Sequence, residues 1–335
     1  MNTMKNTRGF LRMIPSTARG LSCAALVFAL ASPQIAVAAP APSSPSKKSS
    51  SSPSSSQKVF SSPKAAADAL ISAAARYDVA ALTEILGPEG VDLFSTEDPV
   101  QDRNNAGVFA RRGLEKHSVV ADPKNPSRMI LTIGDEDWPS PVPIVRAQKG
   151  WRFDSKAGRQ EILYRRIGGN ELDAIEICRG YVEAQHEYAS KKHDGSRVNQ
   201  YAQRNISTPG KEDGLAWKTA DGKWAGPVGE NIAQAIAQGY SDKMNPYHGY
   251  YYKILKGQGP AAPMGEMDYV VKGAMIGGFA LVAAPADYAV TGVKTFIVSH
   301  TGVVYQKDFG EKTLETFKAM ELFNPDKTWQ VVAGD

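Results

Sequence analysis

The spacing of apolar residues predicts helices at the start of the folded chain. After Ser62-Pro63, an N-cap and first-turn pair, apolar residues recur at helical spacing as far as Gly87-Pro88. This pattern predicts two short helices broken near Tyr77-Asp78, and a third helix over residues 100–116. Three strands follow, because short runs of β-branched and aromatic residues are separated by turn residues. They are expected at residues 129–133, 142–145 and 151–153.

The longest helical pattern in the chain covers residues 157–190, and Gly168-Gly169 is expected to kink or interrupt it. From Tyr250 onward the pattern is that of strands separated by turn-rich connectors. Five strands are expected, at residues 250–255, 268–271, 279–283, 294–299 and 303–307. A last helix is expected over residues 311–323.

The order of these elements predicts the α+β class with two folded domains. Residues 58–154 are expected to join N-terminal helices with a small antiparallel sheet, and residues 155–335 to pack a long helix on an antiparallel sheet. In the second domain the apolar face of the helix should meet the inward face of the strands. The expected contacts join Ile175, Val182 and Tyr188 with Phe279, Leu281, Phe296 and Val298.

The first 38 residues have the pattern of a secretory signal peptide. A basic start precedes the apolar run Leu21–Ala31, and Ala36-Val37-Ala38 offers small residues for cleavage near Ala39. The apolar run is far shorter than the roughly 20 residues that span a bilayer as a helix. We therefore expect a periplasmic or secreted protein. Residues 39–57 are rich in Ser and Pro, which predicts a disordered linker.

Charge and cysteine content bear on the partners expected for the chain and on the role of its cysteines. Four of the 39 basic residues and none of the 35 acidic residues lie in residues 1–38, so the expected mature chain carries 35 of each. Without a net positive domain, nucleic acid is not expected as a partner. Cys23 lies in the signal peptide, which leaves Cys178 alone. Cys178 could be a reactive thiol or a site of intermolecular pairing, but its place between apolar helix residues favours a buried core residue.

Six segments form a specific combination of motifs. They are Phe153–Arg159, Asn170–Ala189, His248–Tyr250, Gly277–Ala283, Thr295–Val298 and Gly302–Asp308. In this combination the chain after residue 58 resembles the bacterial secreted family catalogued as domain of unknown function 2950. The resemblance implies a bacterial envelope protein and no particular activity.

A weaker resemblance concerns architecture alone. With Asn170-Glu171, Ala184-Gln185 and Phe296-Ile297-Val298 in the corresponding order, residues 170–310 resemble the globular domains of type IV pilins and pseudopilins. Those domains pack one long helix on an antiparallel sheet. The apolar, polymerising N-terminal helix of that family is missing here, so the chain is not expected to be a pilus subunit by itself.

Catalytic signatures for phosphate, nucleophile, zinc or dinucleotide chemistry are missing, and no cofactor is expected. His186, His193 and Asp194 could form a metal site only if the helix reached them, and Lys191 and Lys192 oppose a cation. No metal site is therefore expected.

His248 is the most interesting single position, because a histidine beside tyrosines can act as an acid or base or stack on a ring. Glu183 and Glu187 complete the candidate catalytic groups. The alternative is that His248 and Tyr250 begin a half-buried strand whose aromatic face packs on the long helix. Tyr250 is also a candidate ligand-binding residue.

Trp217 and Trp224 lie in a loop rich in Gly and Lys. They could form a glycan-binding shelf or anchor the loop onto the domain. These features favour an exported envelope protein with a structural or binding role, and an envelope protein or a glycan as its partner. One alternative is a periplasmic enzyme acting on cell-wall or glycan substrates. The other is a small-ligand-binding protein, because helices wrapped by a curved hairpin sheet can enclose a pocket in the first domain.

Overall fold

The computed structural model describes residues 57–96, 98–229 and 246–333. The predicted signal peptide lies outside these residues, as does the predicted linker apart from Gln57. The side-chain amide of Gln57 donates to the carbonyls of Ile85 and Phe153, at 3.0 and 2.7 Å, so this residue is part of the folded chain. The chain divides into two compact units between Tyr164 and Arg165. They are called the N-terminal and C-terminal units below.

The N-terminal unit contains the predicted helices, with the predicted break. They are α1 (Pro63–Arg76), α2 (Val79–Leu86) and α3 (Pro99–Glu115). The 3-10 helix η1 (Pro88–Leu93), between α2 and α3, was not predicted. The Ser62 hydroxyl caps α1 by accepting from the Ala65 N–H at 3.1 Å. Tyr77, with φ at 47°, ends that helix, and the Asp78 carboxylate caps α2. Local capping chemistry therefore sets the break.

An antiparallel sheet in the order β1-β2-β4-β5 packs with these helices, and β3 pairs with β2. Its strands are β1 (His117–Asp122), β2 (Asn125–Ile133), β3 (Trp138–Pro139), β4 (Ile144–Ala147) and β5 (Gly150–Phe153). Leu131, Ile144 and Phe153 are fully buried and form one core with the helices. The sequence predicted β2, β4 and β5 but not β1 or β3.

The long helix α4 runs from Ser155 to Ala189, so the interruption expected at Gly168-Gly169 was wrong. A Cβ at either glycine would meet nothing within 4 Å. Glycine lowers helix stability but does not end a helix that continues on both sides. Among the helices of the described ranges, none is long and apolar enough to cross a membrane.

The C-terminal unit is built on an antiparallel sheet in the order β16-β15-β14-β13-β8. Its strands are β8 (Tyr250–Leu255), β13 (Ala280–Pro285), β14 (Lys294–Ser299), β15 (Val304–Asp308) and β16 (Gln330–Val331). The predicted last helix is shorter than expected: η3 (Gly310–Lys312) leads into α6 (Thr313–Ala319).

Three small hairpins complete the C-terminal unit. They are β6 (Trp217–Lys218) with β7 (Trp224–Ala225), β9 (Gly257–Gln258) with β10 (Met267–Asp268), and β11 (Val270–Val271) with β12 (Ala274–Met275). The single strand predicted over residues 268–271 is therefore two strands with different partners.

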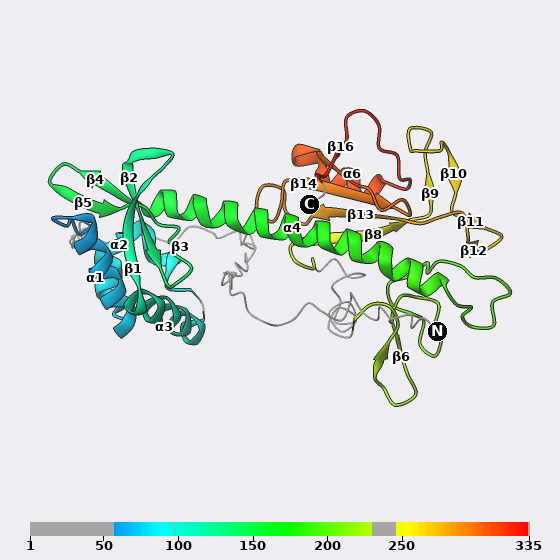
Figure 1. Cartoon of the computed structure of the whole chain (residues 1–335), viewed down its shortest axis with the longest axis horizontal. Coiled ribbons are helices and arrows are strands. Elements are labelled where there is room, and N and C mark those ends of the chain that lie inside the picture. The colour runs from blue at the N-terminus through cyan, green and yellow to red at the C-terminus, as the bar shows by residue number, and fades with distance from the viewer. Residues whose placement is uncertain (1–56, 97, 230–245, 334–335) are drawn as a thin grey trace, which may run out of the picture. The chain divides into compact units, whose positions relative to one another are not determined.

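The core of the C-terminal unit joins α4 to the sheet, and Figure 1 shows the helix lying along β8, β13 and β14. The register pairs Leu281 with Val298 and Ala283 with Phe296, so these residues share one face. The rings of Tyr181 and Phe279 meet edge to face at 5.6 Å. The predicted helix and strand residues all belong to this core or pack against it. The predicted α+β class with a long helix on an antiparallel sheet is confirmed.

Candidate functional site

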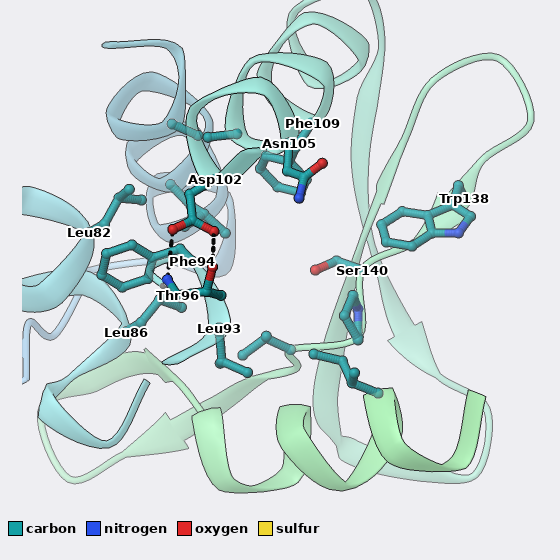
Figure 2. Close-up of a pocket in the computed structure, with 16 residues that line it drawn as sticks. Leu82, Leu86, Leu93, Phe94, Thr96, Asp102, Asn105, Phe109, Trp138 and Ser140 are labelled. Carbon is teal, nitrogen blue, oxygen red and sulfur yellow. Dashed lines mark hydrogen bonds between the residues drawn. The ribbon is translucent and has the colours of Figure 1, made fainter. Parts of the chain in front are cut away.

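A cavity of about 210 Å³ lies within the N-terminal unit (Figure 2). Helices α1, α2 and α3 form much of its wall, and residues of β3, of the β3–β4 connection and of α4 complete the lining. The walls are mainly apolar. Their larger apolar side chains include Leu70, Leu82, Leu86, Phe94, Phe109 and Ile162.

Small residues on facing helices make room for this cavity. At one end α3 lies so close to α1 that a Cβ on Gly113 would come within 2.9 Å of the Ile71 side chain. Farther along the same two helices, Ala74 and Ala106 line the cavity and leave the space unfilled. The small side chains of Ala74 and Ala106 therefore leave a space that larger residues would fill.

Polar side chains also reach this apolar space. Asp102 on α3 is only 6% exposed, and its carboxylate accepts hydrogen bonds from the N–H and the hydroxyl of Thr96, at 2.6 and 2.9 Å. Figure 2 shows the hydroxyl of Ser140 and the amide of Asn105 on the cavity side, between Asp102 and Trp138. The Asn105 Oδ1 accepts from Gln101 at 2.9 Å, which leaves its amide hydrogens as donors.

This arrangement suits binding better than covalent chemistry. Among the described residues that line the cavity there is no histidine, cysteine or lysine. A carboxylate without a neighbouring nucleophile or base can orient a ligand, but it does not form the paired groups of nucleophilic catalysis. A mainly apolar cavity with a few converging polar groups is the usual form of a small-molecule site.

The structure places His248 in a different site, beside a residue that sequence reasoning missed. Its Nδ1 lies 2.6 Å from Oδ2 of Asp173 on α4, and its φ is 49°. Both side chains are nearly half exposed. Glu183 and Glu187 are exposed and lie about 15 and 21 Å farther along α4 from Asp173. The three predicted catalytic candidates are therefore not brought together.

Tyr250 is a core residue in the structure. It is fully buried, and its hydroxyl donates to the Lys294 carbonyl at 2.9 Å. Its hydroxyl occupies the space that a Cβ on Gly292 would need. Burial raises the pKa of Tyr250 far above the ordinary value for tyrosine. This tyrosine stabilises the contact between β8 and the start of β14.

The two predicted ligand-binding tryptophans lie on opposite faces of one hairpin. The β6–β7 register places Trp217 opposite Ala225 and Lys218 opposite Trp224, and successive strand residues alternate between faces. Trp217 meets the ring of His193 edge to face at 5.6 Å, whereas the Lys218 ammonium lies 5.3 Å from the Trp224 ring. The indoles therefore do not form one shared shelf.

The histidines considered as metal ligands have other partners. His193 is hydrogen bonded through Nδ1 to the Glu212 carboxylate at 2.9 Å and through Nε2 to the Tyr188 carbonyl at 3.0 Å. The Asp194 carboxylate accepts from the Glu212 N–H. In the part of the chain that the structure describes, no group of three or more His, Cys, Asp and Glu residues could hold a metal ion.

Comparison with known proteins places the chain in a family, but that family has no assigned activity. The model of the family described as "Protein of unknown function (DUF2950)" matches residues 57–332. No curated protein and no solved structure matches the chain. The likeness of residues 170–310 to pilins stays a prediction.

Proposed function

We propose a function for this chain, which belongs to the DUF2950 family of proteins of unknown function: it is an exported bacterial envelope protein that binds a small, mainly apolar ligand with a polar group in its N-terminal unit. The observation behind the proposal is the apolar cavity into which Asp102, Asn105 and Ser140 bring polar groups.

The cavity volume sets the size of the ligand. A dry apolar cavity of about 150 Å³ accepts benzene. The 210 Å³ found here leaves room for one ring with one or two small substituents. Burial of such a ring stabilises the complex by about 25 cal/mol for each Å² of apolar surface removed from water.

The polar groups set the chemistry of the ligand. The Asp102 carboxylate can only accept hydrogen bonds when ionised, so it favours a donor and disfavours an anion. The Ser140 hydroxyl and the Asn105 amide can serve a neutral oxygen on the same ligand. A ring that carries a hydroxyl, such as a phenol, meets both requirements.

Calorimetric titration of residues 39–335 with p-cresol and with toluene tests this proposal. We expect saturable binding of p-cresol that is tighter than that of toluene, because toluene has the same ring without the hydroxyl. Ala106→Leu should abolish binding by filling the cavity. Asn104→Leu, at an exposed position of the same helix, is the matched control and should bind like wild type. Binding that survives Ala106→Leu would contradict the assigned cavity.

Export is a separate part of the proposal, supported by the basic start, the apolar run and Ala36-Val37-Ala38. Mass spectrometry of the protein from its native host should give a first residue near Ala39. An intact Met1 in the membrane fraction would contradict export with cleavage.

A further inference from the structure

A second cavity, of about 430 Å³, lies in the C-terminal unit between β8, the segment of residues 203–206 and α6. Four consecutive strand residues, Tyr251–Ile254, line it. Successive side chains of a strand point to opposite faces of its sheet. Four consecutive strand residues can therefore line one space only where that space runs along the edge of the strand. We call this space the edge groove.

Within the described residues, the backbone of β8 at the edge groove has no partner on its outer side. The sheet order ends at β8, whose ladder partner among the described strands is β13. The N–H and C=O of Tyr250 bond to Tyr247 and therefore point away from β13. Because backbone groups alternate in direction along a strand, those of Tyr252 and Ile254 point the same way, toward the groove.

At its far end the groove edge is closed again. The carbonyl of Lys256, the next outward-pointing group, accepts from the Tyr269 N–H at 3.0 Å. The open stretch thus consists of the N–H and C=O groups of two residues. It fits a short extended segment and not a long strand. A short open stretch also limits the uncontrolled edge-to-edge pairing that long free edges invite.

The charge of the edge groove is positive. Arg204, Lys253, Lys256 and Lys318 line it, and the described lining includes no carboxylate. Lys253 has an acidic partner, Glu321 at 3.4 Å, and Arg204 has Asp213 at 3.7 Å. For Lys256 and Lys318 the described residues offer no carboxylate within 4.0 Å. Two cations beside an open strand edge therefore remain for the charges of a ligand.

The wall toward α6 is aromatic. Phe317 stacks with Tyr251 at a centroid distance of 6.3 Å, and the Lys253 ammonium lies 5.5 Å from the Phe317 ring. An extended peptide that pairs with Tyr252 and Ile254 would lay alternate side chains against this wall. Apolar residues alternating with acidic ones match the aromatic wall and the lysines.

We propose that the edge groove binds a short acidic segment of another protein, which adds to the sheet as a strand beside β8. Main-chain hydrogen bonds supply affinity in this mode of recognition, and the side-chain contacts supply specificity. Lys256 and Lys318 select acidic residues. This site is in a different unit from the apolar cavity and does not depend on the function proposed for it.

Fluorescence polarisation with labelled peptides and residues 39–335 tests the proposal. The probe is a heptapeptide in which glutamate and valine alternate. One control peptide carries lysine in place of glutamate, and another keeps the sequence but has alternate backbone nitrogens methylated. We expect saturable binding of the acidic peptide, and binding at least about tenfold weaker for either control.

Protein variants locate the binding to the groove. Lys256→Glu combined with Lys318→Glu should weaken the binding of the acidic peptide by at least about tenfold. Lys192→Glu, at an exposed position of the same unit outside the groove, should not. Equal binding of the methylated peptide to the wild-type protein would overturn strand addition. This comparison holds even if the protein variants fail to fold. Binding of polygalacturonate but not of the peptide would replace a protein partner with an anionic glycan, and would also overturn the proposal.

Discussion

The carboxylate of Asp102 accepts two hydrogen bonds from Thr96, one from the backbone N–H at 2.6 Å and one from the hydroxyl at 2.9 Å. The pair joins α3 to the segment that precedes it, at the wall of the apolar cavity. A buried carboxylate needs such donors, because an unpaired charge in an apolar site is costly. Thr96 thus fixes the orientation of the group that would meet a ligand.

Thr96→Val tests this relationship. The change removes the hydroxyl donor at nearly constant volume, and we expect the unfolding free energy of the N-terminal unit to fall by about 1.5–3 kcal/mol, the range for hydrogen bonds to charged groups. Urea unfolding followed through NMR signals of that unit measures it. Thr83→Val is the control, because that hydroxyl is exposed and bonds only within α2. Equal losses in the two variants would contradict a special role for Thr96.

Cys178 should be inert in the native protein. It is fully buried, and burial raises the pKa of its thiol to about 12, so almost no thiolate forms near neutral pH. A thiol reagent at pH 8 should label the unfolded chain quickly and the folded chain hardly at all. Cys178→Ser should lower stability by on the order of 1 kcal/mol, because it buries a hydroxyl. Rapid labelling of the folded chain would show that the thiol is accessible.

Phe296→Ala should be among the most damaging single changes in the C-terminal unit. Phe296 is fully buried, pairs with Ala283 in the ladder and lies 5.9 Å from the Tyr250 ring. We expect a loss of about 3–5 kcal/mol. His248→Ala should cost much less, since that side chain is nearly half exposed. Urea midpoints of the two variants provide the comparison, and an unchanged midpoint for Phe296→Ala would contradict the assigned core.

His300 should make the stability of the C-terminal unit depend on pH. Burial lowers the pKa of His300 below 6.5, with a smaller contribution from His186, and its Nδ1 lacks a hydrogen-bond partner within the described structure. The unfolded chain therefore binds a proton more readily than the folded one. The stability that neutral His300 contributes to the folded state should be complete above about pH 6.5 and should be lost as pH falls below that value. His300→Gln should flatten this part of the profile, and an unchanged profile would exclude His300 as its source.

Much of the fold follows from local sequence, because the responsible interactions are local. Ser62 and Asp78 cap the helices that they precede, and the apolar run of β13 is buried along its whole length. The strand β1 was missed because His117 and Ser118 leave only a short apolar alternation. Residues 268–271 are divided because β10 pairs with β9, which precedes it in the chain, whereas β11 pairs with β12, which follows it.

The candidate sites were harder to predict, because they depend on contacts between distant residues. Ala74 and Ala106 are unremarkable in the sequence, and they matter only because two helices bring them to the same cavity. His248 was identified from its aromatic neighbours, but its partner Asp173 lies 75 residues earlier. No spacing rule connects residues so far apart. The aromatic run around Tyr250 favoured a packed strand, and the structure places it there.

The central claim is that the cavity of the N-terminal unit binds a ring-sized ligand that carries a hydrogen-bond donor. Isotope-edited NMR of residues 39–335 saturated with p-cresol tests it most directly. We predict nuclear Overhauser contacts from the p-cresol protons to the methyl groups of Leu82 and Ile162, with a shift of the Trp138 indole signal. If p-cresol at saturation contacts only the C-terminal unit, or gives no contact to these methyl groups, the account is contradicted.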